Sequence, residues 1–269
     1  ETKPAAAAAA GKPVDLFDFA TILVTREVDV WHWNDPLINS QQKKEWNRTK
    51  NRTYTAVFHF DKKRLVPLAS PEMAELLIPD NPKVAIGSDG RAYQKEITWD
   101  GEYNDVYLVD LQSGARRKIL SHTGSRPFLS PDGRYVAYFE NKHWHLFDVD
   151  KGDIRNLTKD MPVAFYQEGD DHPAPPSAVG WPLWLENDAA VLLYDNYDVW
   201  MFATDARGGV PVSVTAGEGR KENRTFTVLR LDPEQKYFRK GEQLLLSSYH
   251  NAGKNHGFYA ATLGTPGVR

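Results

Sequence analysis

Residues Phe128 to Phe139 read FLSPDGRYVAYF, and this stretch decides the fold. Pro131 fixes φ for the second position of a type I turn, Asp132 can fold its carboxylate onto the local backbone, and Gly133 suits the closing position. The residues from Tyr135 onward are β-branched, aromatic or small, as a strand requires. Both faces of this strand are apolar, so the sequence predicts a turn that leads into an inner strand packed on two sides.

The same pattern recurs along the chain. Leu76 to Gly87 (LLIPDNPKVAIG) aligns with it without gaps and has Pro79 and Asp80 at the positions of the proline and aspartate. A third copy (WLENDAAVLLYD) keeps the aspartate at Asp188, and a weaker fourth copy begins at Gly241. The turn positions of the four copies are Asn81, Gly133, Ala189 and Gly241, which lie 52, 56 and 52 residues apart. Such a period is the signature of a repeat architecture.

A second strand follows each turn and carries an aromatic residue. Its pattern is Asp-Val-aromatic or a variant of it, and a hairpin turn such as Gln112-Ser113-Gly114 comes after it. The recurring aromatic residues are Trp31, Tyr107, Trp144, Trp200 and Tyr259. Repeated aromatics in a repeat protein usually pack between its units, so we interpret them as core; a belt that stacks on ligands is the alternative.

All-β units of about fifty residues, each unable to bury both of its faces alone, favour a β-propeller. About five units nearly fill the chain, at 14–70, 71–122, 123–160, 176–216 and 225–269. The first holds a polar, helical insertion near 35–52, and the Ala/Pro-rich residues 1–13 are expected to be a disordered linker. A β-sandwich is the main competitor, but its strands would not normally repeat at this period.

The last unit predicts an incomplete ring. It stops soon after Phe258-Tyr259-Ala260, before a final strand is recognisable. We therefore expect a part of a larger ring of roughly seven or eight blades. Unpaired sheet edges would then lead the chain to self-associate.

Composition excludes several classes of protein. The 33 basic and 36 acidic side chains give a net charge of −3, which argues against a nucleic-acid binder with a basic face. An aromatic content of 12% is too rich for a disordered chain. Cysteine is absent, which removes disulfides, thiolate metal sites and cysteine nucleophiles. No apolar stretch approaches the eighteen or so residues that would span a membrane.

The chain resembles a known family. The repeat LSPDGRYVAYF followed by HWHLFDVDKGDIRNLT is similar to the propeller repeats of prolyl-oligopeptidase-type serine peptidases and of TolB-like proteins. The phrases VDVWHWNDP, KNRTY, ITWDGEYNDVYLVDLQSGARRKIL and LLYDNYDVW resemble the N-terminal propeller region of large, secreted, dipeptidyl-peptidase-like bacterial members. The resemblance runs from about Val28 to the C-terminus, and its longer phrases are more specific than the repeat itself.

The resemblance implies a non-catalytic role for this chain. In that family the catalytic serine, acid and histidine belong to a C-terminal α/β-hydrolase domain, with the serine in a G-x-S-x-G elbow. Ser88 has glycines at the wrong spacing, and no other serine is closer to that motif, so no catalytic residue is assigned. The implied parent is a serine peptidase, a hydrolase of the periplasm or the extracellular space. Its propeller would admit short peptides to the hydrolase domain and exclude folded proteins.

Metal and cofactor sites are not expected. His143 and His145 share one face of a strand, but a third ligand is not evident nearby. The run from Asp100 to Asp105 lacks the loop pattern and closing glutamate of a calcium site. The acidic run from Glu168 to Asp171, followed by His172, is interpreted as a solvated loop that could border a substrate path.

Three functions stay open from the sequence. The first is the peptide-gating propeller module, whose partners would be a hydrolase domain and short peptides. The second is a self-contained propeller that serves as a scaffold for protein–protein binding. The third is a propeller glycosidase with two acids about 5–10 Å apart, for which the sequence nominates no pair.

Overall fold

The computed structural model describes residues 30–78, 81, 83–205 and 209–269. The predicted linker at 1–13 therefore lies outside the described residues. The chain divides into two compact units, Glu1–Arg52 and Thr53–Arg269. Among the described residues, the helices are all too short or too polar to cross a membrane.

The described part of the first unit is centred on helix α2 (Asn39–Thr49), within the predicted insertion. Local polar contacts hold the helix: Gln42 donates to the Leu37 carbonyl at 2.7 Å, and Arg48 pairs with Glu45 at 2.7 Å. The helix buries none of its residues, which is typical of a helix that is polar all round. Trp31 precedes it, lies outside every described strand and is 52% exposed. The interpretation of the recurring aromatics as core is therefore wrong for Trp31.

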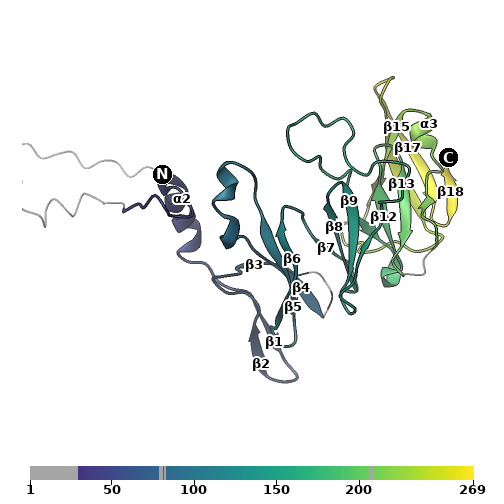
Figure 1. The fold of residues 1–269 in the computed structure, drawn as a ribbon. Coiled ribbons are helices and arrows are strands. Elements are labelled where there is room, and N and C mark those ends of the chain that lie inside the picture. The colour runs from purple at the N-terminus through teal and green to yellow at the C-terminus, as the bar shows by residue number, and fades with distance from the viewer. Residues whose placement is uncertain (1–29, 79–80, 82, 206–208) are drawn as a thin grey trace, which may run out of the picture. The chain divides into compact units, whose positions relative to one another are not determined.

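The second unit consists of antiparallel sheets, so the all-β prediction is confirmed (Figure 1). Two strands, β1 (Ala56–His59) and β2 (Arg64–Pro67), form a hairpin. Four further sheets have four strands each, and we call them blades 1 to 4 in chain order.

The strand order within each blade follows the chain. Blade 1 contains β3 (Glu75–Leu77), β4 (Val84–Asp89), β5 (Asn104–Asp110) and β6 (Arg116–Thr123). Blade 2 contains β7 (Phe128–Leu129), β8 (Tyr135–Glu140), β9 (His143–Asp148) and β10 (Ile154–Asn156). Blade 3 contains β11 (Leu183–Trp184), β12 (Ala190–Tyr194), β13 (Val199–Ala203) and β14 (Val212–Ser213). Blade 4 contains β15 (Arg224–Leu229), β16 (Gln243–His250), β17 (Asn255–Thr262) and β18 (Thr265–Val268). Sequential antiparallel order in every sheet is the arrangement of propeller blades.

One sequence expectation needs correction. The final unit does not stop short of its last strand, because β18 pairs with β17 through Ala261↔Val268 and Thr262↔Thr265. Pro266 and Gly267 make this strand hard to recognise in the sequence, since both residues disfavour strands; proline is tolerated at an edge. Of the expected unit at 14–70, the described residues contain helix α2 and the β1–β2 hairpin.

Apolar cores join each blade to the next. Val136 of blade 2 packs in one cluster with Ile86 of blade 1, and Trp144 of blade 2 packs with Leu193 of blade 3. Equivalent clusters join blade 3 to blade 4 and the β1–β2 hairpin to blade 1. The first four residues of β8 are all buried, which is the two-sided packing that the sequence predicts. Stacking therefore covers the faces that a single sheet would leave in water.

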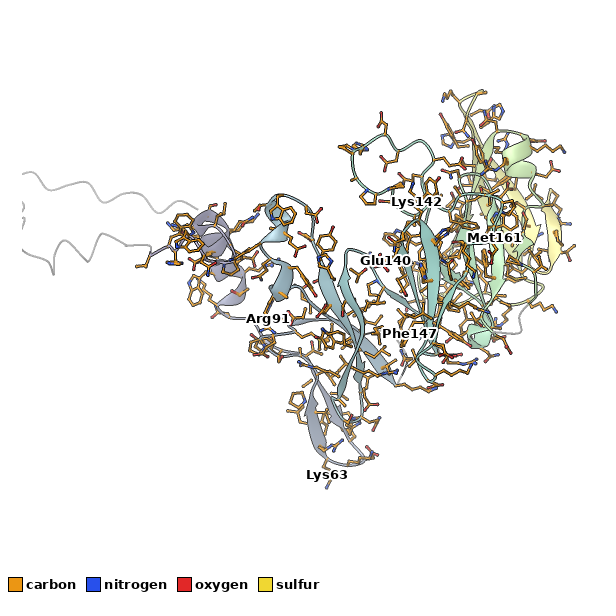
Figure 2. All side chains as sticks on the ribbon, viewed as in Figure 1. Lys63, Arg91, Glu140, Lys142, Phe147 and Met161 are labelled. Atoms are coloured by element: carbon orange, nitrogen blue, oxygen red, sulfur yellow. The ribbon has the colours of Figure 1, made fainter. Side chains whose placement is uncertain are left out.

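Antiparallel order gives the second unit two ends with different connections. At one end lie the links between blades and the turns between the second and third strands of each blade; we call it the crossover end. The opposite end carries the turns after the first and third strands, and we call it the hairpin end. Figure 2 shows Glu140 and Lys142 at the crossover end of blade 2 and Phe147 farther toward the hairpin end.

Candidate functional site

The repeat turns at the hairpin end bind one blade to the next. Asp188 of blade 3 accepts hydrogen bonds from the Ser130 hydroxyl at 2.5 Å and from the backbone N–H groups of Asp132 and Arg134 of blade 2 at 3.1 and 3.2 Å. Both Asp188 and Ser130 are fully buried. These turn residues consequently have their polar groups occupied within the protein.

The other turn positions lie in different local environments. Asn81 is buried, and its Oδ1 accepts from the N–H groups of Lys83 and Val84, both at 2.9 Å. Gly133 has a φ of +71° and lies against the Asn81 side chain. Gly241 has a φ of +82°, and a methyl group added there would have no described neighbour within 4 Å. Pro131 lies in the turn before β8, and Pro79 and Asp80 lie outside the described residues.

The recurring aromatics of the blades occupy different environments. Trp144 is 1% exposed in the core between blades 2 and 3. Trp200 is half-buried against that core and donates from its indole N–H to Asp195 at 2.9 Å. Tyr107 and Tyr259 are half-buried, and each faces a cation, Lys118 and Arg224 respectively.

The aspartates of the Asp-Val-aromatic pattern hold the crossover end together. Asp105 accepts from Tyr93 at 2.6 Å, from Lys118 at 2.5 Å and from the His122 N–H at 3.1 Å. Burial raises the pKa of Asp105, but these hydrogen bonds outweigh burial and leave the pKa below its usual value. In blade 3, Asp198 accepts from Thr215 at 2.5 Å and from two backbone N–H groups that begin helix α3 (Glu218–Lys221).

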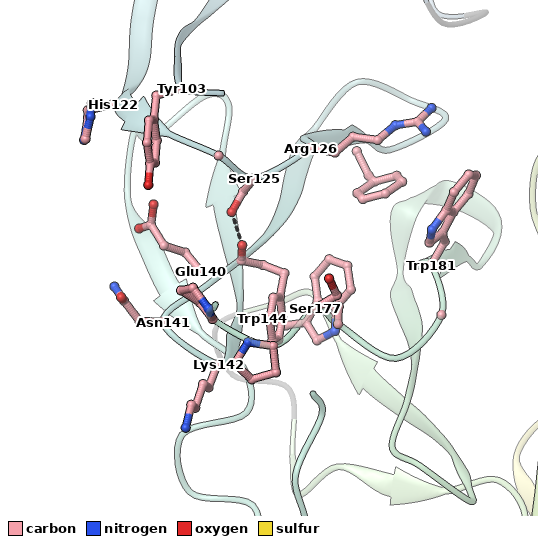
Figure 3. A pocket seen from close by; sticks show the side chains of 17 residues that line it. Tyr103, His122, Ser125, Arg126, Glu140, Asn141, Lys142, Trp144, Ser177 and Trp181 are labelled. Carbon is pink, nitrogen blue, oxygen red and sulfur yellow. Dashed lines mark hydrogen bonds between the residues drawn. The ribbon is translucent and has the colours of Figure 1, made fainter. Parts of the chain in front are cut away.

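A pocket of about 1020 Å³ opens at this crossover end (Figure 3). Four segments line it: the connection between β4 and β5, the link from blade 1 to blade 2, the turn between β8 and β9, and the link that leads to blade 3. Its apolar lining is largely aromatic and includes Tyr103, Phe128, Phe139, Trp144 and Trp181. Its charged side chains, apart from His122 at one rim, are Arg126, Glu140 and Lys142. An apolar pocket with a few polar groups is the usual form of a ligand site.

Arg126 lies beside two neighbouring rings of this pocket. Its guanidinium carbon lies 5.4 Å from the centre of the Phe128 ring and 4.7 Å from that of the Trp181 ring. Trp181 is 63% exposed, and the Phe128 ring lies 6.0 Å from both Trp181 and Trp144. Figure 3 shows Arg126 and Trp181 on one side of the pocket and Glu140, beside Tyr103, on the other.

His122 forms the rim near Tyr103. Its Nε2 lies 2.7 Å from Glu96, and its ring stacks on Tyr103 with centroids 4.2 Å apart. Tyr93 meets the same ring edge-on at 4.7 Å. His122 also has a φ of +49°, a left-handed backbone that non-glycine residues adopt at a cost, so the network around it fixes an otherwise unfavourable conformation.

The other candidate groups from the sequence lie apart from the pocket or are occupied. His145 stacks on Tyr138 at 5.1 Å, and burial lowers the pKa of this histidine. Within the described ranges, the sole grouping of three side chains with metal-ligand spacing is Asp170, Asp171 and His172. Asp170 there accepts from His172 Nδ1 at 2.6 Å, so an internal contact already uses this carboxylate.

Sequence reasoning missed the pocket residues themselves. Arg126 and Trp181 stand in links outside the repeat pattern, 55 positions apart in the chain. The available signal was weak: Gly124-Ser125-Arg126 and the proline-rich run before Trp181 mark both segments as links between blades. Nothing in their spacing shows that the two links meet.

Comparison with known proteins finds distant structural neighbours. Protein-family models and curated proteins gave no match to the chain. Similar solved structures include a putative TolB from Agrobacterium tumefaciens, with 13% identity, 76% of this chain and 73% of that chain covered, and a TM-score of 0.36. The β-propeller domain of the Trilobed protease from Pyrococcus furiosus has 13% identity, 71% coverage of both chains and a TM-score of 0.36.

Dipeptidyl peptidase 4 from Porphyromonas gingivalis is also similar, with 14% identity, 78% of this chain covered and a TM-score of 0.35. The chain spans 30% of that enzyme's length. TolB-like and peptidase propellers are the proteins that the sequence resemblance names. Likeness at this level concerns the fold alone, because one fold serves many functions.

Proposed function

We propose that this chain is a non-catalytic β-propeller module of a prolyl-oligopeptidase-type serine peptidase. In this proposal it gates and orients peptide substrates for an α/β-hydrolase domain, which supplies the catalytic serine. The sequence phrases quoted above support the family, and the sequential four-stranded blades agree with it. We place such a protein in the periplasm or outside the cell, as the resemblance implies.

The observation that carries the peptide-binding part is the pocket at the crossover end. Its aromatic walls suit apolar side chains, while Arg126, Glu140 and Lys142 offer charges to the ends or side chains of a peptide. Its lining segments are links and turns, which can differ between relatives without disturbing the strands. The blades thus supply a rigid frame, and the links supply the selectivity.

The two alternative functions have less support. A glycosidase needs two carboxyl groups across one bond, and Glu140 is the sole acid among the described residues that line the pocket. Asp195 and Asp198 are buried near each other, and burial raises the pKa of Asp195, but backbone and side-chain donors occupy both carboxylates. A protein-binding scaffold would need no pocket of this depth.

Two experiments test the proposal. The reading frame downstream of Arg269 should encode a G-x-S-x-G domain, and a stop codon there would favour the scaffold instead. The purified chain should bind peptides of four to ten residues by titration calorimetry without cleaving them. Binding of folded proteins but not of peptides would contradict gating.

A further inference from the structure

We propose that Arg126 is the anchor for a peptide carboxylate in the crossover-end pocket. The inference rests on the proposed function and deepens it, because it specifies which peptides the pocket prefers. The carboxylate is either a peptide C-terminus or an acidic side chain, and an apolar residue beside it would lie on the aromatic wall.

The first argument compares Arg126 with the other arginines that stack on rings. In the described part of the chain, six arginines do so: Arg117, Arg126, Arg134, Arg220, Arg224 and Arg239. Five of them also donate hydrogen bonds from the guanidinium to an acceptor of the protein. Arg126 is the exception: it contacts two rings, and no carboxylate of the described residues lies within 4 Å of it.

The guanidinium of Arg126 has donors to spare. Its N–H groups point outward in the plane of the group, both rings lie to one side of it, and no hydrogen-bond acceptor of the described residues takes up these donors. Two of these donors match the two oxygens of a carboxylate, and such bidentate pairs are among the strongest hydrogen bonds in proteins. The rings also hold the side chain in place, which reduces the rotamer entropy that binding would otherwise cost.

A buried donor in the wall of the same pocket lacks an acceptor. Trp144 is almost fully buried, and its indole N–H has no hydrogen-bond partner among the residues that the structure describes. Burying a donor without an acceptor costs about 1–3 kcal/mol, and so such groups call for an explanation. Trp144 lines the pocket and lies next to Phe128, the ring that also contacts Arg126. Because this indole nitrogen is itself buried, it is not assigned as a contact of the peptide.

Charge selects the direction of binding. Glu140 occupies the side of the pocket away from Arg126 in Figure 3, so a carboxylate placed there would meet repulsion. At Arg126 the ligand carboxylate meets a cation that no described carboxylate neutralises. The other cation of the lining, Lys142, lies on the same side of the pocket as Glu140 in Figure 3, so we expect an acidic peptide to place its carboxylate at Arg126.

The test measures binding of three N-acetylated pentapeptides by calorimetry at low salt. The first, Ac-AAPAF, has a free C-terminus; the second is its C-terminal amide; the third, amidated Ac-AAEAF, carries only a side-chain carboxylate. We expect at least one carboxylate peptide to bind about tenfold or more tightly than the amide, which corresponds to about 1.4 kcal/mol. The stronger of the first and third peptides identifies the source of the carboxylate.

Variants assign the effect to Arg126. Arg126→Gln should abolish the preference, so that the carboxylate peptides and the amide bind with equal affinity. Arg134→Gln is the matched control, because Arg134 also stacks on a ring, 5.3 Å from Tyr135, but at the hairpin end. It should bind all three peptides like the unaltered protein. Arg126 is exposed, so thermal unfolding of its variant should match that of the parent.

The outcomes separate this inference from the proposed function. Tight binding of peptides with equal affinity for acid and amide, or with no change in Arg126→Gln, overturns the inference and leaves gating intact. The reverse case, in which a carboxylate binds but peptides do not, is tested with the single amino acid N-acetylphenylalanine in comparison with its amide. If this acid binds through Arg126 but no pentapeptide does, the carboxylate site stands and the gating proposal fails.

Discussion

Asp188 accepts a hydrogen bond from the hydroxyl group of Ser130 at 2.5 Å, although 58 residues separate the two in the chain. Each belongs to the turn of a different blade, and both are buried. The repeat motif is therefore more than a local turn signal, because the aspartate of one copy satisfies backbone and side-chain donors of the copy before it. The aspartate that marks the sequence period at position 188 is thus also the residue that makes the contact between these two blades.

Replacing Asp188 should destabilise the whole second unit. Asp188→Ala would leave the Ser130 hydroxyl and the Asp132 N–H without their acceptor, whereas the Arg134 N–H would keep the Ser130 hydroxyl oxygen; we expect a cost of about 2–4 kcal/mol in the free energy of unfolding. Asp188→Asn keeps one acceptor oxygen and should cost less. Urea unfolding followed by circular dichroism measures both. Asp150→Asn, at an exposed hairpin position, is the control, and an equal effect there would contradict the contact's importance.

Alanine substitutions at two glycines distinguish the cost of backbone strain from the cost of a clash between blades. Gly133 and Gly241 both have positive φ, so alanine at either should cost about 1–2 kcal/mol. At Gly133 a methyl group would also lie 2.8 Å from Asn81 Oδ1 of the neighbouring blade, whereas at Gly241 it would meet no described atom within 4 Å. Gly133→Ala should therefore lower the free energy of unfolding by at least about 1 kcal/mol more than Gly241→Ala.

A double variant checks the cause of that difference. Removing the Asn81 side chain in an Asn81→Ala background should relieve the clash, so the added cost of Gly133→Ala should shrink. If the cost stays the same in both backgrounds, the contact between these blades is not what limits position 133.

Strand β8 and the turn before it could be predicted because their residues combine turn chemistry with a continuous apolar run. Strand β18 could not be, because its Pro266 and Gly267 have low strand propensity and the pairing with β17 decides its structure. Trp31 shows the opposite failure: it shares the Asp-Val-aromatic pattern, but no described strand contains it. Local pattern identifies a repeat, and tertiary pairing decides which copies form strands.

The pocket lay beyond sequence reasoning for a different reason. Arg126 is one of 33 basic residues, and nothing local distinguishes it from a solvated side chain. Its importance arises only when the link to blade 3 brings Trp181 over its guanidinium. The links do not follow the repeat period, so the sequence alone cannot show which of them lie side by side in the fold.

Asp105 should make stability depend on pH in the acid range. Burial raises the pKa of Asp105, but the hydrogen bonds from Lys118 and Tyr93 outweigh burial and hold this pKa below its usual value in the folded chain. The unfolded chain then binds the proton more tightly, so this contribution is complete above the unfolded pKa of about 3.9 and is lost as the pH falls through the folded pKa. Asp105→Asn removes it at all pH values.

The measurement is the free energy of unfolding between about pH 7 and pH 3 for both proteins. The difference in the free energy of unfolding between the parent and Asp105→Asn should be largest near neutral pH and should decrease as the pH falls. Asp160→Asn serves as the control, because the Asp160 side chain is exposed and lies 4.0 Å from its nearest cation. A gap for Asp105→Asn that does not change with pH would show that its hydrogen bonds do not depend on its charge.

The β1–β2 hairpin should drive self-association of the chain. Its inner face packs Val66 against blade 1, while Phe58 and Leu65 pair across the strands on the outer face and are 47% and 61% exposed. Phe60 extends this patch, edge-on to Phe58 at 5.1 Å and 85% exposed. A two-stranded sheet with an apolar outer face can pair with the same surface of another copy.

Sedimentation velocity should show a fraction of oligomer that rises with the protein concentration. The dissociation constant of the oligomer should increase at least about tenfold in the double variant Phe60→Ser/Leu65→Lys. Ile154→Ser, which removes an exposed apolar residue from β10, should leave association unchanged; a parent protein that stays monomeric up to millimolar concentration would refute the prediction.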